Sequence, residues 1–73
     1  MARLANISGK NAVKAFERLG YSIARQTGSH VILKHPSRPT LTIPDHKELA
    51  PGLLRAVISQ AGLSVTDFIK NLP

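Results

Sequence analysis

The stretch from Tyr21 to Ile43, YSIARQTGSHVILKHPSRPTLTI, decides the fold class of this protein. Three short runs in it are rich in β-branched and aliphatic residues: Tyr21–Gln26, Ser29–His35 and Thr40–Ile43. Thr27-Gly28 separates the first two runs as a two-residue hairpin connection, and the prolines of Pro36-Ser37-Arg38-Pro39 prevent ladder pairing between the second and third runs. The stretch therefore predicts a three-stranded antiparallel meander.

A turn centred on Thr27-Gly28 sets the predicted register of the first hairpin. The cross-strand neighbours in that register are Arg25 and His30, Ile23 and Ile32, and Tyr21 and Lys34. The two faces of the hairpin are nearly balanced in apolar residues: one carries Tyr21, Ile23 and Ile32, the other Ala24, Val31 and Leu33. The alternation therefore leaves open which face is buried.

An amphipathic helix is predicted before the sheet, over residues 9–19. Ser8 is a natural N-cap for this helix and Gly20 a natural C-terminal stop. Apolar residues recur between them at helical spacing: Ala12, Val13, Phe16 and Leu19. Basic residues four apart form a stripe elsewhere on the same helix: Lys10, Lys14 and Arg18.

Two further helices are predicted after the sheet. Pro51 suits the first turn of a helix that Gly62 ends, and its apolar stripe consists of Leu54, Val57, Ile58 and Ala61. Ser64-Val65-Thr66-Asp67 resembles a capping box, and the short helix after it carries Phe68, Ile69 and Leu72 on one side. The order of elements predicts an α+β fold with helices on one face of an antiparallel sheet. No repeat or linker interrupts the chain, so we expect residues 1–73 to form a single domain.

Composition excludes several classes of function. The 73 residues include no cysteine, which excludes disulfide frameworks, thiolate zinc sites, iron–sulfur clusters and cysteine nucleophiles. No apolar stretch approaches the roughly 20 residues of a membrane span, and the N-terminus lacks the apolar block of a signal peptide. We therefore expect a small soluble protein in the cytoplasm. A chain this short offers no large cleft between domains, so an active site would lie on an open surface or be completed by a partner.

The net charge of +6 is concentrated in the first half of the chain. Residues 1–40 hold seven basic residues and one acidic residue, whereas residues 41–73 hold three of each. Such an excess in a small domain favours a polyanionic partner, most often a nucleic acid.

The candidates for acid–base chemistry are three histidines and four carboxylates. His30 and His35 lie five apart on a predicted strand, so their side chains point to opposite faces and do not easily share a metal site. His30 stands out because it follows Gly28-Ser29 in a segment whose charged residues are all basic: Arg25, Lys34 and Arg38. A phosphate bound there would meet cationic donors, a hydroxyl group and an imidazole that transfers protons near neutral pH.

Several motifs in one order, covering nearly the whole chain, resemble a known family. They are Lys10 in Ser-Gly-Lys, Gly20-Tyr21, Arg25-Gln26-Thr27-Gly28-Ser29-His30, Ile43-Pro44 with His46, and Leu54-Arg55 through Gln60-Ala61-Gly62-Leu63. Together they resemble the HicA (YcfA-like) toxins of the HicAB toxin–antitoxin systems. Two positions depart from the family pattern: Thr27 stands where many relatives carry a basic residue, and Pro51-Gly52-Leu53 replaces a pattern with threonine after the glycine.

The resemblance implies a fold like that of the double-stranded-RNA-binding domain. It also implies a ribosome-independent mRNA endonuclease that is neutralised by a HicB-type antitoxin. Because the basic chain has no convincing metal cluster and one well-placed imidazole, we expect this cleavage to need no metal or other cofactor. The catalytic histidine of the family falls on His30. A non-catalytic RNA-binding module of the same fold, or a small adaptor that binds an acidic protein, would have the same charge.

The residues around His30 have expected roles in binding RNA. Arg25 and Lys34 would bind flanking phosphates, and Ser29 would orient the substrate or the imidazole. Gly28 is also expected among the RNA-binding residues. His46 is the candidate for a second imidazole. Lys10 would extend the electrostatic track, together with Lys14 and Arg18.

Overall fold

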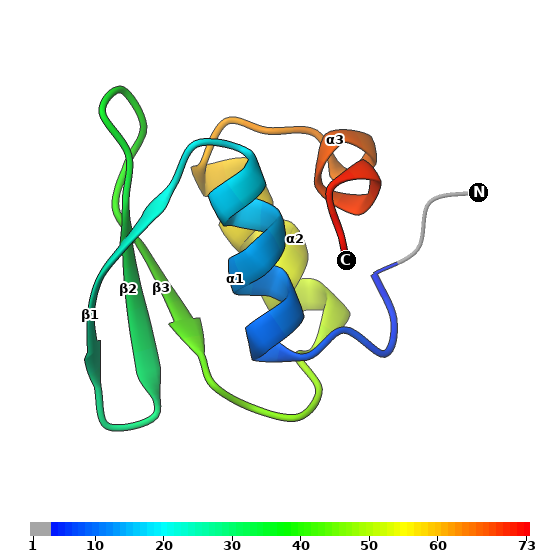
Figure 1. The fold of residues 1–73 in the computed structure, drawn as a ribbon. Helices are drawn as coiled ribbons and strands as arrows, with labels where there is room; N and C mark the ends of the chain where they lie inside the picture. Colours follow the sequence, from blue (N-terminus) through cyan, green and yellow to red (C-terminus); the bar gives the residue numbers. More distant parts are fainter. Residues whose placement is uncertain (1–3) are drawn as a thin grey trace.

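The computed structural model describes residues 4–73 and contains six elements of secondary structure. In chain order they are α1 (Gly9–Arg18), β1 (Ser22–Thr27), β2 (His30–Lys34), β3 (Leu41–Pro44), α2 (Pro51–Gln60) and α3 (Val65–Lys70). The three strands form one antiparallel sheet in the order β1-β2-β3, and all three helices lie on the same side of it (Figure 1). The predicted α+β arrangement is confirmed, and its order is the one that the resemblance implies.

The helices begin where the sequence places capping side chains. The hydroxyl of Ser8 accepts a hydrogen bond from the backbone N–H of Asn11 at 3.1 Å, and Ser64 accepts one from Asp67 at 3.0 Å. Pro51 occupies the first turn of α2, where its missing N–H costs no hydrogen bond. The predicted starts of α1 and α2 are therefore confirmed, and α1 ends one residue before the predicted Leu19.

The turn between β1 and β2 is centred on Gly28-Ser29, so the predicted turn at Thr27-Gly28 is wrong. Thr27 pairs with His30, and Gly28 has φ of +57° at the first central position, as a type II′ hairpin requires. Asp45 donates its backbone N–H to the carbonyl oxygen of Ser29 at 2.6 Å, a contact that also holds the turn in this position.

The shifted turn changes every predicted cross-strand pair. The observed pairs are Arg25 with Ile32, Ile23 with Leu33, and Ser22 with Lys34, with a β-bulge between Ile23 and Arg25. The bulge inserts one extra residue into β1, so the alternation of faces along that strand is reset at Ala24.

The face that carries Val31 and Leu33 is the buried one, which answers the question that the sequence left open. Both side chains are buried, together with Leu41 and Ile43 of β3. The helices cover this face of the sheet, while the other face points away from them (Figure 1).

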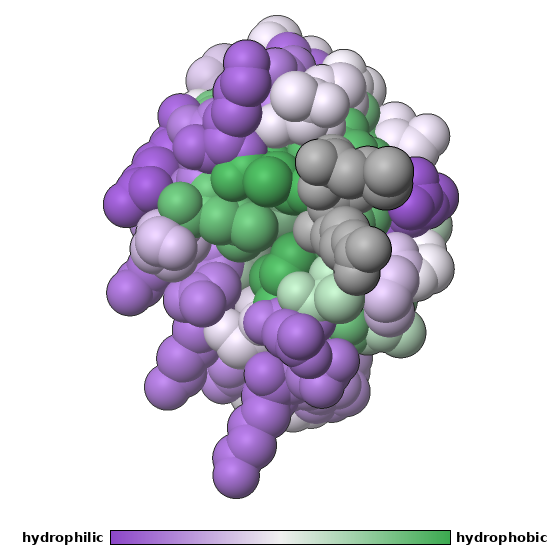
Figure 2. Space-filling model, turned by 90° about the vertical axis from the view of Figure 1, so that its right-hand side faces the viewer, coloured by the Kyte–Doolittle hydropathy of each residue, from purple (hydrophilic) through white to green (hydrophobic). Residues whose placement is uncertain are grey.

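Phe16 of α1 lies at the centre of the core. Its ring packs edge-on against Tyr21, with ring centroids 5.7 Å apart, and against Phe68 of α3 at 5.0 Å. The apolar residues of the last segment, Leu63, Val65, Ile69 and Leu72, are only partly buried against this core. The side of the molecule that carries α3 accordingly shows an apolar area bordered by hydrophilic residues (Figure 2).

None of the helices within residues 4–73 has the length and apolar sequence needed to cross a bilayer.

Candidate functional site

His30 is the first residue of β2 and follows the Gly28-Ser29 turn directly. Its backbone is held on both sides, because it pairs with Thr27 of β1 and with Pro44 of β3. The side chain is exposed on the face of the sheet that points away from the helices. A fixed backbone and an exposed ring leave the imidazole accessible to a large ligand.

Arg25 and Lys34 lie on the same face as His30, although the predicted pairing of Arg25 with His30 is wrong. Arg25 pairs with Ile32, which is two residues from His30 and therefore on its face. Arg25 and His30 are therefore diagonal neighbours on adjacent strands, about 7–8 Å apart, a distance that long side chains span. Lys34 is four residues along β2, about 13 Å from His30. Both cationic side chains are exposed.

Lys10 and His46 come together at the start of α1. Gly9 donates its backbone N–H to the carbonyl oxygen of His46 at 2.8 Å. A side chain at Gly9 would collide with the carbonyl oxygen of Pro44, so only glycine allows the helix to approach the loop this closely. Lys10 and His46 line one open cavity of about 340 Å³, whose other lining residues are Ser8, Asp45 and Lys47. Lys47 also belongs to this cluster, and no motif in the sequence marks it as a site residue.

The cavity of Lys10 and His46 and the turn of His30 are joined through one short segment. Pro44 pairs with His30, and the next residue, Asp45, binds the carbonyl oxygen of Ser29 and lines the cavity. The structure therefore places the two groups of residues at the same end of the sheet. His30 itself does not line the cavity.

Two of the basic residues in the first half of the chain have structural contacts. Arg18 donates to the carbonyl oxygens of Asn71 and Leu72 at the end of α3, at 3.1 and 3.3 Å. Arg38 donates to the carbonyl oxygen of Ala61 at 2.8 Å, just after α2. These contacts favour a structural role for Arg18 over its expected part in a basic track, although the residue is exposed.

His35 belongs to the packing at the opposite end of β2. Its ring lies on Tyr21, with ring centroids 4.9 Å apart, and its Nδ1 accepts the backbone N–H of Ser37 at 3.0 Å. Burial raises the pKa of Tyr21 above its usual value of 10.0, and the positive charge of Arg38 opposes this shift. Tyr21 donates its hydroxyl to the carbonyl oxygen of Pro39 at 2.8 Å. These contacts fix the loop between β2 and β3.

No group of three or more histidine, cysteine or acidic residues in the described part of the chain is arranged to hold a metal ion.

A comparison with protein-family models matches residues 9–63 to a model described as HicA toxin of bacterial toxin–antitoxin. The matched range runs from the start of α1 to just beyond α2, and it contains every residue discussed around His30 and in the cavity except Ser8. No curated protein matches the sequence.

Proposed function

Since the chain belongs to the HicA toxin family of bacterial toxin–antitoxin systems, we propose that it is a ribosome-independent mRNA endonuclease whose catalytic residue is His30. The observation that carries this proposal is the exposed imidazole of His30 on an open sheet face that also bears Arg25 and Lys34. An open face suits a long polymeric substrate better than a small molecule, which needs an enclosing pocket.

The proposed reaction is cleavage of the RNA chain by its own 2′-hydroxyl. The 2′-oxygen loses its proton and attacks the adjacent phosphorus, the bond from phosphorus to the 5′-oxygen breaks, and the 5′-oxygen gains a proton. The products are a 2′,3′-cyclic phosphate and a 5′-hydroxyl. His30 performs proton transfer, for which an imidazole is suited because its ordinary pKa lies near neutrality.

Arg25 and Lys34 bind the phosphates that flank the cleaved bond. Arg25, the diagonal neighbour of His30, is near enough to contact the reacting phosphate or the next one. Lys34, about 13 Å from His30 along β2, would contact a phosphate further along the RNA strand. Cationic donors at these places neutralise charge that grows on the phosphate oxygens during attack.

Gly28 and Ser29 present His30 to the substrate. The left-handed conformation of Gly28 makes the tight turn, and the absence of a side chain there leaves the backbone open to a phosphate. Ser29 directly precedes His30 in the chain and is exposed, and its hydroxyl serves to orient the substrate.

Lys10 and His46 extend the RNA path beyond the turn. Both are exposed, and the cavity that they line lies at the same end of the sheet as His30. Lys10 binds a phosphate there, and His46 is the second imidazole of the interface.

The partner of the protein is an antitoxin of the HicB type, which inhibits by covering His30. A substrate face this open can be blocked by a bound protein without any change in the fold of the toxin. The net charge of +6 favours rapid association with an acidic partner at low salt. Because the proposed substrate is mRNA, the proposed activity takes place in the cytoplasm.

Incubation of the purified protein with an RNA and with a DNA of the same sequence, in the presence of EDTA, tests the proposed function. We expect the RNA to be cut to products with 2′,3′-cyclic phosphate ends and the DNA, which lacks the 2′-hydroxyl, to remain intact. Binding of the RNA without cleavage would instead support a non-catalytic RNA-binding module. Activity that EDTA abolishes and a divalent ion restores would overturn the metal-independent mechanism.

A further inference from the structure

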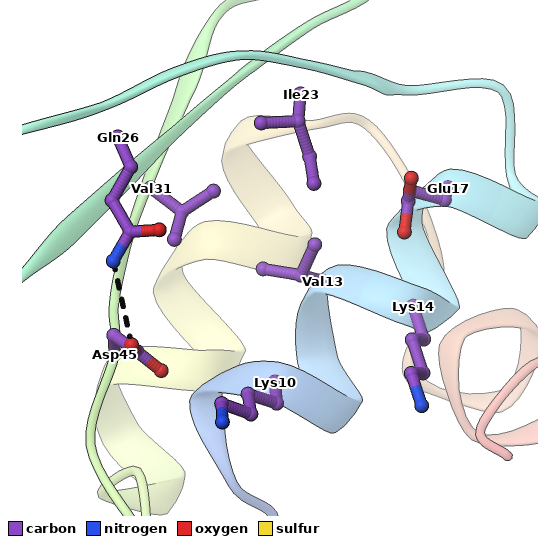
Figure 3. A pocket seen from close by; sticks show the side chains of 8 residues that line it. All are labelled: Lys10, Val13, Lys14, Glu17, Ile23, Gln26, Val31 and Asp45. Carbon is purple, nitrogen blue, oxygen red and sulfur yellow. Dashed lines mark hydrogen bonds between the residues drawn. The ribbon is translucent and has the colours of Figure 1, made fainter.

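A groove lies between α1 and the first two strands (Figure 3). Its volume is about 220 Å³, and its apolar residues are Val13 of α1, Ile23 of β1 and Val31 of β2. Val31 and His30 are adjacent in β2 and point to opposite faces, so the groove is separate from the catalytic face.

Ile23 is unusual because it faces the helix side of the sheet and is nevertheless 51% exposed. The bulge after Ile23 places it opposite Leu33, on the face that is otherwise buried. β1 is an edge strand, however, and an open groove lies between Ile23 and α1. Ile23 and Leu53 of α2 are the two large apolar side chains exposed within residues 4–73.

The rim of the groove carries charges of both signs. Lys10 and Lys14, four residues apart on α1, project from one wall. Glu17 lies at one end of the groove, and Asp45, which accepts a hydrogen bond from the Gln26 amide at 3.5 Å, lies at the other (Figure 3).

We propose that this groove docks an acidic peptide segment of the antitoxin. An apolar side chain of the segment packs against Ile23 and Val13, and carboxylates on either side of it contact Lys10 and Lys14. Lys10 and Lys14 make the α1 wall of the groove positive, so carboxylates on that side of the segment are complementary to it. This proposal rests on the proposed function, because the antitoxin that supplies the segment is part of that function.

The arrangement of charges favours a peptide over RNA in the groove. A continuous phosphate backbone running along it would meet Glu17 at one end and Asp45 at the other, whereas a peptide places its charges one by one. The residues that line the groove include no aromatic side chain on which a base would stack.

The edge position of β1 connects this groove to the inhibition of the enzyme. Because no strand of residues 4–73 lies outside β1, a segment that leaves the groove can pass around β1 and reach the face of His30. The groove then anchors the antitoxin, and another part of the same partner covers the imidazole.

Antitoxin affinity of matched single variants tests the proposal. Ile23→Ser removes the exposed apolar side chain from the groove, and Leu53→Ser makes the same kind of change on α2, away from it. We expect calorimetry to show at least tenfold weaker antitoxin binding for Ile23→Ser and less than a twofold change for Leu53→Ser. Lys14→Glu should weaken binding by a similar factor, in contrast to Lys70→Glu on α3. NMR spectra of each free variant confirm that it is folded.

Several results would overturn the docking proposal. One is unchanged antitoxin affinity in Ile23→Ser, and another is weakening of RNA binding in Ile23→Ser and Lys14→Glu without any effect on the antitoxin. An antitoxin that fails to bind the wild type also overturns it, even if the protein cuts RNA. Antitoxin binding that depends on Ile23, found together with absence of RNA cleavage, would instead support the groove and contradict the proposed enzymatic function.

Discussion

Arg25 and Arg18 form a matched pair of arginines for distinguishing the proposed RNA binding from effects on folding. Arg25 is exposed on the face of His30, whereas Arg18 donates to the carbonyl oxygens of Asn71 and Leu72. We predict that Arg25→Ala reduces the salt dependence of RNA binding without changing stability. Arg18→Ala should instead lower stability and leave the salt dependence of RNA binding unchanged.

The magnitudes follow from the contacts of each guanidinium group. Loss of one phosphate contact to a single strand reduces the slope of log affinity against log salt concentration by about 0.7. Arg25→Ala should therefore lower the slope by about 0.7 and leave the free energy of unfolding within about 0.5 kcal/mol of the wild type. Arg18→Ala removes exposed hydrogen bonds at the C-terminus of α3 and should cost about 1 kcal/mol, which lowers Tm by about 4–8 °C.

The assay is fluorescence anisotropy with a short labelled RNA at several salt concentrations, carried out with each substitution added to His30→Ala to prevent cleavage. Thermal unfolding followed by circular dichroism gives Tm for the same proteins. A slope that Arg25→Ala leaves unchanged and Arg18→Ala reduces would refute the assignment of the RNA path to the open face of the sheet.

Two further predictions concern stability. Gly28 has φ of +57°, and no atom lies within 4 Å of the place where a Cβ would be. Gly28→Ala should therefore lower the free energy of unfolding by about 1–2 kcal/mol from backbone strain alone, and Gly28→Asn clearly less. Equal stability of the wild type and both variants in urea unfolding would contradict the described turn. The raised pKa of Tyr21 means that the unfolded chain loses the phenolic proton first, so its contribution to stability is present below pH 10 and is lost as the pH rises further. The free energy of unfolding should therefore fall more steeply above pH 10 in the wild type than in Tyr21→Phe, and identical pH dependences would show that burial does not perturb this group.

The helix starts and the number of strands could be predicted from the sequence, because residues close by in the chain specify them. Ser8 and Ser64 cap their helices through their own hydroxyl groups, and Pro51 marks the start of α2, so these boundaries depend on residues within one turn of the helix. The number of strands also followed from the stretch between Tyr21 and Ile43.

The register of the sheet could not be predicted, because distant contacts decide it. Thr27-Gly28 and Gly28-Ser29 are both acceptable as two-residue connections, and the hydrogen bond from Asp45 to Ser29 joins residues 16 apart in the chain. The bulge at Ala24 leaves no signal in the alternation of residues. The exposure of Ile23 depends on that bulge, so the groove could not be predicted from the sequence either.

The grouping of candidate site residues was predicted only in part. Arg25 and Lys34 were expected on the face of His30 and lie there, although the pairing used to argue it was wrong. The meeting of Lys10 with His46 depends on the contact between Gly9 and the loop after β3, which no local pattern specifies. The contact between Arg18 and the end of α3 joins residues far apart in the chain, so the four-residue spacing of the basic stripe gives no sign of it.

The central claim is that His30 transfers protons in RNA cleavage, and the cleavage rate of His30→Ala tests it most directly. The exposed side chain at the start of β2 contributes little to the core, so the variant should fold with a stability within about 1 kcal/mol of the wild type. With the same RNA in EDTA, we predict a cleavage rate at least about 100-fold below that of the wild type, as for loss of a general acid or base. A folded His30→Ala protein that cuts the RNA at a rate near that of the wild type would contradict the account.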